Sequence, residues 1–300
     1  MTMNRGGFSA LLAPGFRKIW VDVTDFKEQP LIGRQLVNLK TSKRAFEEER
    51  DVDGFGTLAA KTEGGPVSYE DMRDGATKRY THDMYGLGFR VTEEMYEDDL
   101  YGVFGTKMTK ALGRSARNNM ELVMHAPYNN AFSTSYTGFR SGESLCSLTH
   151  TTIRGASFAN RNDVDFSLLA LQAALEHFES LTNEAGLPAM FTPKIVLHTI
   201  QDRWLVHQVL KSQFLPGGNQ NDINVVASEG LRPIQSRFLT DTDSWFVIAN
   251  EHDVNYYERR ALRFTNTDDF DTGDAKYKAT IRHTSGFGKW QGIWGSAGAT

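Results

Sequence analysis

The residues of this sequence with the most obvious chemical potential are a single cysteine, eight histidines and a short acidic motif near residue 241. Cys146 and His150 supply at most two ligands to a zinc ion, and no second pair stands at the spacing that a structural zinc site requires. A cysteine nucleophile would also need an orienting group within a defined motif, and none is visible. We therefore expect a buried thiol and a loop histidine.

The acidic motif Asp241-Thr242-Asp243 is the second candidate, because an Asp-x-Asp pair can hold the divalent metal of a glycosyltransferase. It lies between two apolar segments with the composition of strands, Ile234–Leu239 and Trp245–Ala249. Asp, Thr and Ser favour turns, so a tight turn is the simpler interpretation. The glycine-rich phosphate-binding motifs and the nucleophile elbow are absent. The sequence thus predicts no catalytic residue, no metal site and no cofactor.

The composition is that of a soluble globular protein with one large or two modest domains. Of 300 residues, 40% are hydrophobic and 23% are charged. The net charge of −4, from 33 basic and 37 acidic residues, argues against a general nucleic-acid-binding protein. No apolar run is long enough for a membrane span, and the N-terminus is too weakly patterned for a secretory signal. A single cysteine excludes an internal disulfide and fits a reducing cytosol.

Charge is unevenly distributed along the chain. Residues 1–44 contain eight basic and three acidic residues, a net charge of +5, whereas residues 45–75 contain nine acidic and three basic residues, a net charge of −6. Opposite charges steer association, so we expect the two segments to contact each other on different subunits; the alternative is two separately solvated segments. The predicted contact residues are Arg5, Arg17, Lys18, Lys40, Lys43, Arg44, Glu47, Glu48, Glu49, Asp51, Asp53, Glu63, Glu70, Asp71 and Asp74.

The acidic segment also has the composition of a long excursion. Five glycines and a proline punctuate Asp51–Gly75, which is longer than an ordinary connection. The flanking segments, Val37–Arg44 and Lys78–Val91, contain strand-forming residues. The sequence therefore predicts an extended hairpin. A two-stranded hairpin is marginal in water and needs a surface to lie on, which favours a partner subunit.

The clearest helix is predicted over Phe104–Ala126, where apolar residues recur with a 3.6-residue period and Pro127 should end or kink the helix. We expect Glu121 and His125 on its polar face, and Ala111 and Leu122 on its apolar face. The polar face also carries four cations at spacings of 3, 4 and 3 residues, which is either a solvated surface or a contact for a polyanion. These cations are Lys107, Lys110, Arg114 and Arg117.

The middle of the chain is typical of an α/β unit. Leucine-rich amphipathic patterns predict helices over Phe166–Leu181 and Gln201–Ser212. A short apolar run over Pro193–His198 predicts a buried strand between them. The two apolar segments around the acidic motif add further strands.

Several local segments together resemble one family. Arg237–Val247 followed by Phe270–Ala279 gives strand, acidic turn and strand, then a turn and a long alternating strand. This layout resembles the C-terminal half of tailed-bacteriophage major capsid proteins with the Hong Kong 97 (HK97-like) fold. The likeness covers roughly residues 85–298, and residues 1–84 match by layout only. Further similar segments are Val91–Leu100, Asn129–Phe132, Leu145–His150 and Asn221–Asn224.

The resemblance implies an α+β shell fold and a structural, non-enzymatic role. The expected parts are an N-terminal arm (1–45), an extended loop or E-loop with flanking strands (46–90), a peripheral domain with a long spine helix (91–144), an α/β axial domain (145–254) and return strands of the peripheral domain (255–300).

Function and partners follow from the same resemblance. Copies of the chain would form pentamers and hexamers that close an icosahedral head around double-stranded DNA, assembled in the bacterial host cytoplasm and ending in the virion. A separate scaffolding protein, a portal and a decoration protein are the other expected partners, with no membrane. The four-cation stripe would face the packaged DNA and contact phosphate without sequence preference.

Two alternatives remain open at this stage. The first is an encapsulin-like cellular nanocompartment, which has the same fold around an enzyme cargo. The second is a metal-dependent α/β enzyme of the glycosyltransferase type that would use Asp241 and Asp243. Such an enzyme would form a small discrete oligomer and need a divalent metal, whereas a nanocompartment would form closed small shells without DNA and have a groove for a cargo peptide.

Overall fold

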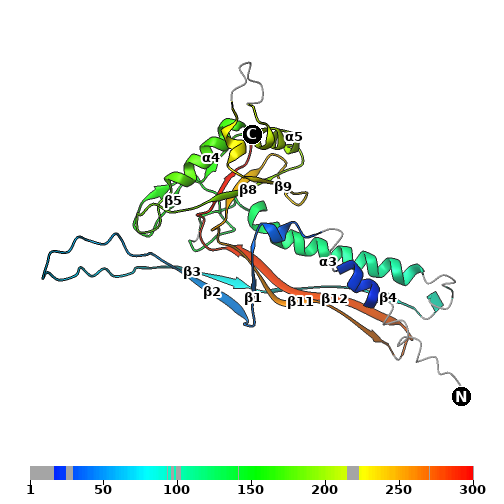
Figure 1. The fold of residues 1–300 in the computed structure, drawn as a ribbon. Coiled ribbons are helices and arrows are strands. Elements are labelled where there is room, and N and C mark those ends of the chain that lie inside the picture. The colour runs from blue at the N-terminus through cyan, green and yellow to red at the C-terminus, as the bar shows by residue number, and fades with distance from the viewer. Residues whose placement is uncertain are drawn as a thin grey trace.

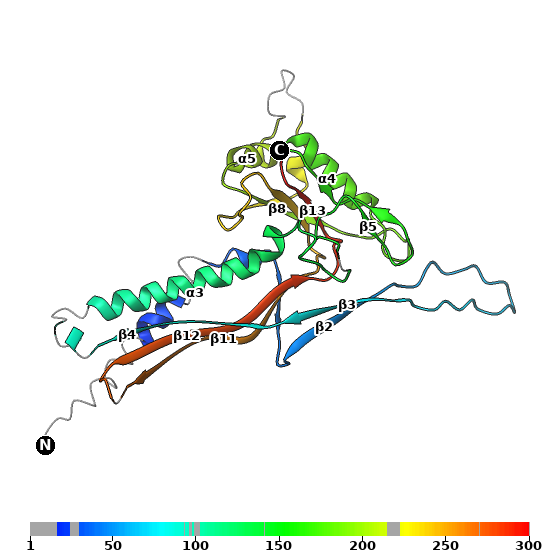
Figure 2. The same cartoon turned by 180° about the vertical axis from the view of Figure 1, so that it is seen from behind.

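The computed structural model describes residues 17–24, 30–92, 94–95, 98, 103–140, 142–214, 223–269 and 271–299. Figure 1 shows an upper body of helices and short strands above an elongated layer in which α3 lies along a sheet. A long hairpin extends from this layer in the direction away from α3, as both Figure 1 and Figure 2 show. The expected α+β class is confirmed, with helices packed on several sheets.

The upper body is built on a five-stranded sheet of order β7-β13-β10-β8-β9. Its central strand, β10 (Trp245–Ala249), is buried at every residue and pairs antiparallel with β13 (Ile293–Ser296) and β8 (Pro193–His198). The edge strands β7 (Arg161–Asn162) and β9 (Arg232–Gln235) join in parallel. Burial on both faces explains why β10 is a continuous apolar run rather than an alternating one.

Two helices cover one face of this sheet. α4 (Leu168–Ser180) begins after Ser167, whose hydroxyl oxygen accepts a hydrogen bond from the amide of Ala170 and so caps the helix. α5 (Arg203–Lys211) follows β8. The apolar sides of both helices pack in one cluster with Trp245 of β10. Both helices are confirmed, each one or two residues shorter at either end than predicted.

The strand predictions for this body differ in their success. The buried strands predicted over residues 193–198 and 245–249 are confirmed at both ends as β8 and β10. The strand predicted over Ile234–Leu239 is displaced, because β9 occupies Arg232–Gln235. β9 pairs with only one neighbour, β8, and that pairing begins at Arg232, two residues before the apolar run. An edge strand is thus placed by its partner rather than by its own hydrophobicity.

The lower layer is a four-stranded sheet of order β1-β11-β12-β4. β11 (Val254–Asp268) and β12 (Ala275–Phe287) form its long antiparallel centre. β4 (Asp83–Val91) joins β12 antiparallel, and β1 (Asn38–Thr41) joins β11 in parallel. Alternate residues of β12 are buried beneath α3, as expected for a strand with one covered face.

α3 (Val103–Asn129) is the long helix of this layer and continues past Pro127. A proline lacks the amide that would bond the carbonyl of Val123, four residues earlier. The hydroxyl of Ser285 in β12 donates to that carbonyl instead, at 2.5 Å. Because the sheet satisfies the freed acceptor, the helix continues to Asn129, and the prediction that it ends near Ala126 is wrong; the alternative of a kink stays a prediction.

The buried side of α3 also differs from the prediction. Glu121 and His125 were expected on the polar face, yet both are fully buried. The Glu121 carboxylate accepts hydrogen bonds from the amides of Ile32 (2.7 Å) and Gly33 (2.9 Å), which balance its charge. A side chain at Gly33 would meet Met124 at 2.5 Å, so only glycine allows this close approach. Two positions predicted to be apolar and buried are instead exposed: Ala111 and Leu122.

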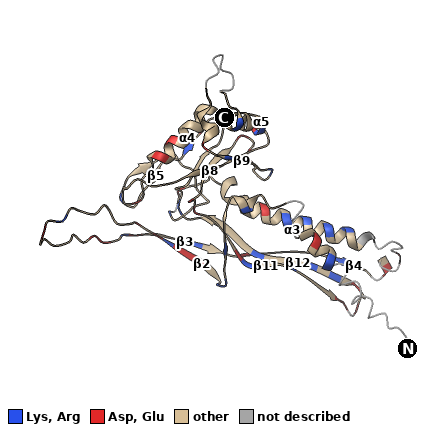
Figure 3. Cartoon of the chain, viewed as in Figure 1, with Lys and Arg blue, Asp and Glu red and all other residues tan. Residues whose placement is uncertain are grey.

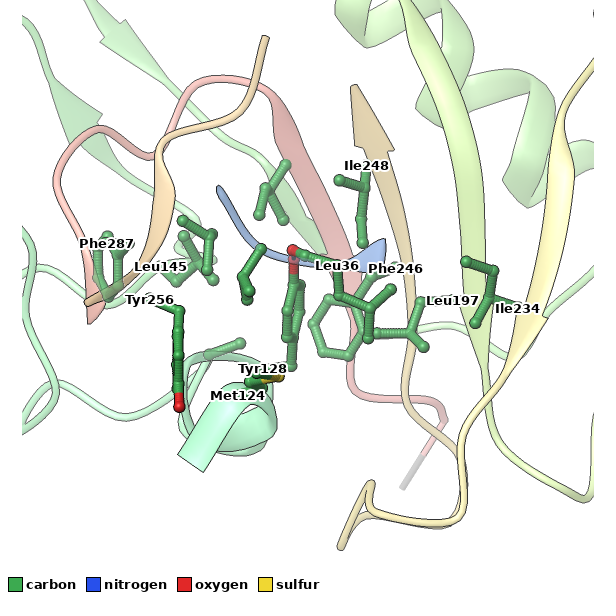
Figure 4. Packing of buried hydrophobic residues seen from close by; sticks show 14 of the residues in the cluster. Leu36, Met124, Tyr128, Leu145, Leu197, Ile234, Phe246, Ile248, Tyr256 and Phe287 are labelled. Atoms are coloured by element: carbon green, nitrogen blue, oxygen red, sulfur yellow. Dashed lines mark hydrogen bonds between the residues drawn. The ribbon is translucent and has the colours of Figure 1, made fainter. Parts of the chain in front are cut away.

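One apolar cluster joins the lower layer to the upper body, as Figure 4 shows. Met124 and Tyr128 of α3 meet Phe246 of β10, with the rings of Tyr128 and Phe246 at 5.5 Å between centroids. Tyr256 of β11 belongs to the same cluster. The Tyr128 hydroxyl donates to the backbone carbonyl of Leu36 at 2.5 Å, which satisfies the phenol in its buried position. The helix, both sheets and the segment before β1 thus share a core.

The predicted long excursion is confirmed as a two-stranded hairpin. β2 (Phe46–Val52) pairs antiparallel with β3 (Asp74–Thr81), and Val52 opposite Asp74 is the last pair of the ladder. Residues 53–73 continue beyond it as a long projection (Figure 2). Leu58 and Tyr69 in this projection are 101% and 95% exposed. Asp53 at the start of the projection is buried, whereas Leu58 and Tyr69 further out have no cover from their own chain.

Several short elements complete the described structure, and none of its helices is long and apolar enough to cross a membrane. A helix also runs over residues 17–24 of the predicted arm. The division into five ranges from arm to return strands stays a prediction. The remaining short elements are η2 (Gly33–Gln35), β5 (His150–Thr151), β6 (Ser157–Phe158) and η3 (Val225–Ser228).

Candidate assembly surfaces

Glu49, predicted to contact a neighbouring subunit, is enclosed by its own chain. Its carboxylate lies 2.7 Å from the Lys40 ammonium and accepts hydrogen bonds from Tyr80 (3.1 Å), Asn255 (3.2 Å) and the Tyr257 hydroxyl. Burial alone would raise the pKa of this carboxyl group, but the bonds from Lys40 and Tyr257 outweigh it and lower the pKa. Glu49 is thus a structural anion at the base of the hairpin.

Other acidic residues at the hairpin base also have partners within the chain. Glu47 accepts a hydrogen bond from Ser42 at 2.7 Å and lies 4.0 Å from Arg44. Exposed ion pairs of this kind contribute little stability. They do leave these carboxylates less available for contact with a neighbouring subunit. The other pairs are Arg79 with Glu48 (2.6 Å), Arg50 with Asp74 (3.2 Å) and Lys289 with Asp51 (3.0 Å).

Arg154, in the turn between β5 and β6, ties the two legs of the hairpin together just where the ladder ends. Its guanidinium lies 3.0 Å from Asp53 and 2.7 Å from Glu70, and it also donates to the carbonyl of Gly54. Asp53, fully buried, accepts a further bond from the amide of Arg73 at 2.6 Å. That amide and then Arg154 lower the pKa of Asp53. Sequence reasoning missed Arg154, because a lone arginine in a turn belongs to no recognisable pattern.

The remaining predicted contact residues differ from these. Glu63 and Asp71 in the hairpin are exposed, and neither forms an ion pair with another described residue. On the arm side, Arg17, Lys18 and Lys43 are exposed too. The last predicted residue lies outside the described part of the chain: Arg5.

Three of the four cations predicted as a stripe on α3 form an exposed row, visible in blue in Figure 3. Lys107, Lys110 and Arg114 form no ion pair with any described residue. Arg117 is different, because its side chain is only 19% exposed and lies 3.8 Å from the buried Glu121. It also donates to the carbonyl of Pro30 at 3.3 Å. Arg117 therefore anchors the segment before η2, and the free stripe has three members.

The sheet face that points away from α3 carries a second group of cations, which sequence reasoning missed. Alternation along β12 buries residues 277, 279, 281 and 283 under α3 and turns the residues between them to the other side. The pairing adds cations from β4 and β11 to the same face. We call this set the cationic sheet face: Arg90, Arg260, Arg263, Lys276, Lys278 and Arg282.

Charges of the same sign face each other directly on this surface. Arg260 stands opposite Arg282, an arrangement that is destabilising in an isolated sheet. Nε and Nη2 of Arg260 are buried and have no hydrogen-bond partner among the described residues. Asp269 and Asp274 lie at one end and compensate only the cations there. The face thus carries more positive charge than the acidic residues beside it neutralise. The alternation along β12 was the only sign of this face in the sequence. Arg260 and Arg263 of β11 can be placed on it only when the register of β11 against β12 is known.

The residues considered for chemistry form no active site. Burial raises the pKa of the Cys146 thiol, which disfavours the reactive thiolate. The His150 ring stacks on Trp290 at 4.4 Å between centroids, and its Nε2 lies 2.9 Å from Asn160 Oδ1. The predicted buried thiol is confirmed, whereas His150 is no loop residue, because it is fully buried and begins strand β5. Among the described residues, no three or more His, Cys, Asp or Glu side chains gather as a metal site would require.

The Asp-x-Asp motif is an exposed turn. The amide of Asp243 donates to Asp241 Oδ1 at 3.1 Å, a local bond typical of aspartate in turns. Both carboxylates are exposed immediately before β10. The turn interpretation is confirmed.

Comparison with known proteins points to one family. A family profile described as "Phage capsid protein" matches residues 75–295. The capsid structure of the cyanophage P-SCSP1u is similar with a TM-score of 0.56 and 13% identity, covering 88% of this chain and 87% of that one. A procapsid of bacteriophage JBD30 gives 0.53 and 16%, covering 98% and 76%.

Two further results complete the comparison. A virus-like particle from Pyrococcus furiosus is similar with a TM-score of 0.53 and 11% identity, covering 94% of this chain and 98% of that one. A search of curated protein sequences found no match. At these identities the solved structures establish the fold, and the family rests on the profile match.

Proposed function

Since this chain belongs to the phage capsid protein family and is a structural major capsid protein with the HK97-like fold, we propose that its copies form pentamers and hexamers that close an icosahedral shell around double-stranded DNA. The family match carries this proposal, because it spans the hairpin strand β3, the lower layer and the upper body. Many copies of a modest contact hold one another in a closed shell, so avidity stabilises the whole.

The hairpin of one copy lies on the cationic sheet face of the next. Three observations support this docking. Leu58 and Tyr69 in the projection over residues 53–73 have no cover from their own chain. Glu63 and Asp71 in it are free of ion pairs with described residues, and on the cationic sheet face Nε and Nη2 of Arg260 have no hydrogen-bond partner among those residues. Docking would therefore satisfy both surfaces at once. The arm residues Arg17, Lys18 and Lys43 remain candidates for a further contact with the same hairpin.

The opposite side of the lower layer faces the packaged DNA. Lys107, Lys110 and Arg114 form a straight row along α3, about 10 Å long at 1.5 Å per residue. A straight row of cations contacts phosphate and has no geometry for reading bases. Because the row and the cationic sheet face lie on opposite sides of one layer, the two surfaces meet different partners.

We assign the protein no catalytic step, and its place is the virion after assembly in the bacterial cytoplasm. The buried thiol and the exposed Asp turn support the first part, since neither offers an activated nucleophile or a metal site. A scaffolding protein, a portal and a decoration protein are expected to assist, as they do in the family that the sequence resembles.

A nanocompartment shell is the second candidate, favoured by the similarity to the virus-like particle over 98% of that chain. The two candidates differ in content rather than in fold. A phage head encloses nuclease-protected DNA, whereas a nanocompartment encloses protein. Particles that contain a protein cargo and no DNA after a complete infection cycle would favour the second candidate.

The size of the purified protein tests the proposal directly. The full chain, alone or with its scaffolding protein, should give closed shells in electron micrographs and sediment as particles of megadalton mass. Replacement of residues 53–73 by a short Gly-Ser turn is the matched variant, and it should remain small while its far-ultraviolet spectrum stays unchanged. A wild-type chain that stays a small discrete oligomer under all assembly conditions would contradict the proposal.

A further inference from the structure

α5 presents an unusual surface for a short helix. Trp204 is 77% exposed, and Gln208 and Lys211, four and seven residues further on, are exposed as well. These positions line one side of the helix, and Val206 and Val209 on the opposite side are buried in the core. An exposed tryptophan is the kind of large apolar side chain that anchors protein interfaces.

The same lobe of the upper body carries more exposed apolar area around the helix. Such contiguous apolar surface is uncommon on a protein that works alone, and it marks an interaction site. The charge on the outer side of α5 is positive, from Arg203 and Lys211, and neither cation forms an ion pair with a described residue. The additional exposed side chains of this lobe are Ile200, Leu205, Phe214, Ile223 and Val225.

α4 presents a row of the same geometry and opposite charge. Leu169 is 76% exposed, and Ala173 and Glu176, four and seven residues further on, are exposed too. Glu179 adds a second exposed acid on the outer surface. No described residue forms an ion pair with either glutamate. Figure 3 shows the acidic residues on α4 and the basic residues on α5.

The two rows match position by position. Each begins with an exposed apolar residue and ends, seven residues later, with a charge, Glu176 in one row and Lys211 in the other. Seven residues of helix span about 10.5 Å, so parallel helices would bring both the apolar and the charged ends together. The middle positions are Ala173 and Gln208, and the small alanine allows close approach.

The rows cannot meet within one chain, because the helices lie on opposite sides of the apex in Figures 1 and 2. The segment that leads into α4 is bonded to Ser296 of β13, near one edge of the sheet. α5 instead contacts β9, at the other edge. A contact between two different surfaces of identical copies is head-to-tail, and such contacts form a ring when the rotation from copy to copy closes.

We propose that α4 of one copy packs in parallel against α5 of the next around each ring of the shell, with Leu169 beside Trp204 and Glu176 beside Lys211. The inference rests on the proposed assembly and identifies the ring contact within it. The partner that covers α5 is a second copy of this chain, because α4 of that copy carries the opposite charge at the same spacing. A polyanion would match the cations of α5 but leave its apolar lobe uncovered.

Disulfide trapping tests the register in the full chain. The variant Ala173→Cys with Gln208→Cys places thiols at the matched middle positions, and the only native cysteine, Cys146, is buried. Oxidised shells should give a ladder of covalent oligomers up to five or six chains. The offset variant Ser180→Cys with Gln208→Cys, displaced by about 10.5 Å along the helix, should give none.

The outcomes separate this inference from the proposed assembly. Shells that form from the matched variant but give no ladder would overturn the helix contact and leave shell assembly standing. A ladder from the offset variant alone would equally overturn the stated register. A parent chain that forms no shell under any condition would instead contradict the proposed function.

Charge reversal is the second measurement and needs no cysteine. Glu176→Lys and Lys211→Glu should each reduce the yield of shells at low salt, because each places like charges across the contact. The double variant should restore the yield. Single variants that assemble as well as the parent, or a double variant no better than either single one, would overturn the pairing of these two residues.

Discussion

The five-stranded sheet of the upper body and the extended hairpin use β-structure in opposite ways. β10 has a partner strand on each side, helices over one face and the shared core beneath the other, so all five of its residues are buried. β2 and β3 have only each other, and their burial alternates. The hairpin has no core of its own, and side-chain contacts hold its base: Arg154 with Asp53, Lys289 with Asp51 and Lys40 with Glu49.

This difference in burial indicates which part of the chain is stable by itself. The upper body and lower layer share one core and should fold without a neighbour. The hairpin contributes little to that core, and we propose that its exposed apolar and acidic side chains contact another copy. The following predictions test this separation, beginning with the largest expected effect.

Phe246→Ala should cost about 3–5 kcal/mol of unfolding free energy, because the ring is fully buried between Tyr128 and Phe132. Leu58→Ala in the hairpin is the matched control and should change stability by less than about 0.5 kcal/mol, since Leu58 is 101% exposed. Urea denaturation of the unassembled subunit measures both. Equal losses in the two variants would mean that the hairpin shares the core.

Acid should weaken the body before it affects the hairpin. Burial lowers the pKa of His283 to about 4, and the same holds for His177 and His252. Below pH 6.5 the unfolded chain binds protons that the folded chain cannot, so the free energy of unfolding should fall as pH drops towards 4. For His283 the loss at pH 5 is about 2 kcal/mol.

Thermal or urea denaturation at pH 7 and pH 5 measures this effect, and His283→Gln should make the decline shallower. His283 bonds Asn119 of α3 and Tyr256 of β11, so its protonation acts between helix and sheet. A stability that stays constant from pH 7 to pH 5 would show that the histidine protonates freely in the folded state.

Arg154→Gln should loosen the hairpin and leave the body unchanged. The substitution removes the charged bonds to Asp53 and Glu70 where the ladder ends. Trypsin should then cleave after Lys61 and Arg73 several-fold faster, with little change in the melting temperature. Arg161→Gln, which removes a pair with Asp163 in the body, is the control and should leave these cleavage rates unchanged. Equal cleavage in both variants would assign Arg154 no role in the hairpin.

The smallest effect concerns the surface of α3. Replacing Lys107, Lys110 and Arg114 by Gln should leave the fold intact and weaken non-specific binding to duplex DNA. The slope of log affinity against log salt should fall by about 0.9 for each cation removed. Lys276→Gln, on the opposite side of the layer, should leave the slope unchanged. An unchanged slope in the triple variant would remove α3 as the DNA-facing surface.

The predictable part of the molecule is the part that local pattern dictates. β8 and β10 are short apolar runs and α4 has periodic apolar residues, so the positions of all three followed from the sequence. Pro127 misled because its effect depends on Ser285, a residue 158 positions away that no local pattern connects to it. Glu121 misled because two backbone amides, invisible in side-chain patterns, solvate it inside the core.

The assembly surfaces were harder to predict for a related reason. Charge segregation identified the acidic hairpin, but the pairing of Glu49 with Lys40 within one chain depends on the fold. Reversal of Glu47, Glu48 and Glu49 would therefore disturb the subunit itself, whereas reversal of Glu63 and Asp71 tests the contact between copies. The cationic sheet face required the register of β11 against β12, which sequence alone does not give.

Hydrogen exchange of the free subunit and of the assembled shell shows whether a neighbouring copy completes the hairpin. The amides of β10 should be equally protected in both states, because the body is complete without a neighbour. The amides of residues 46–81 should exchange rapidly in the free subunit and gain strong protection in the shell. Equal protection of residues 46–81 in both states would contradict the claim that a neighbouring copy completes the hairpin.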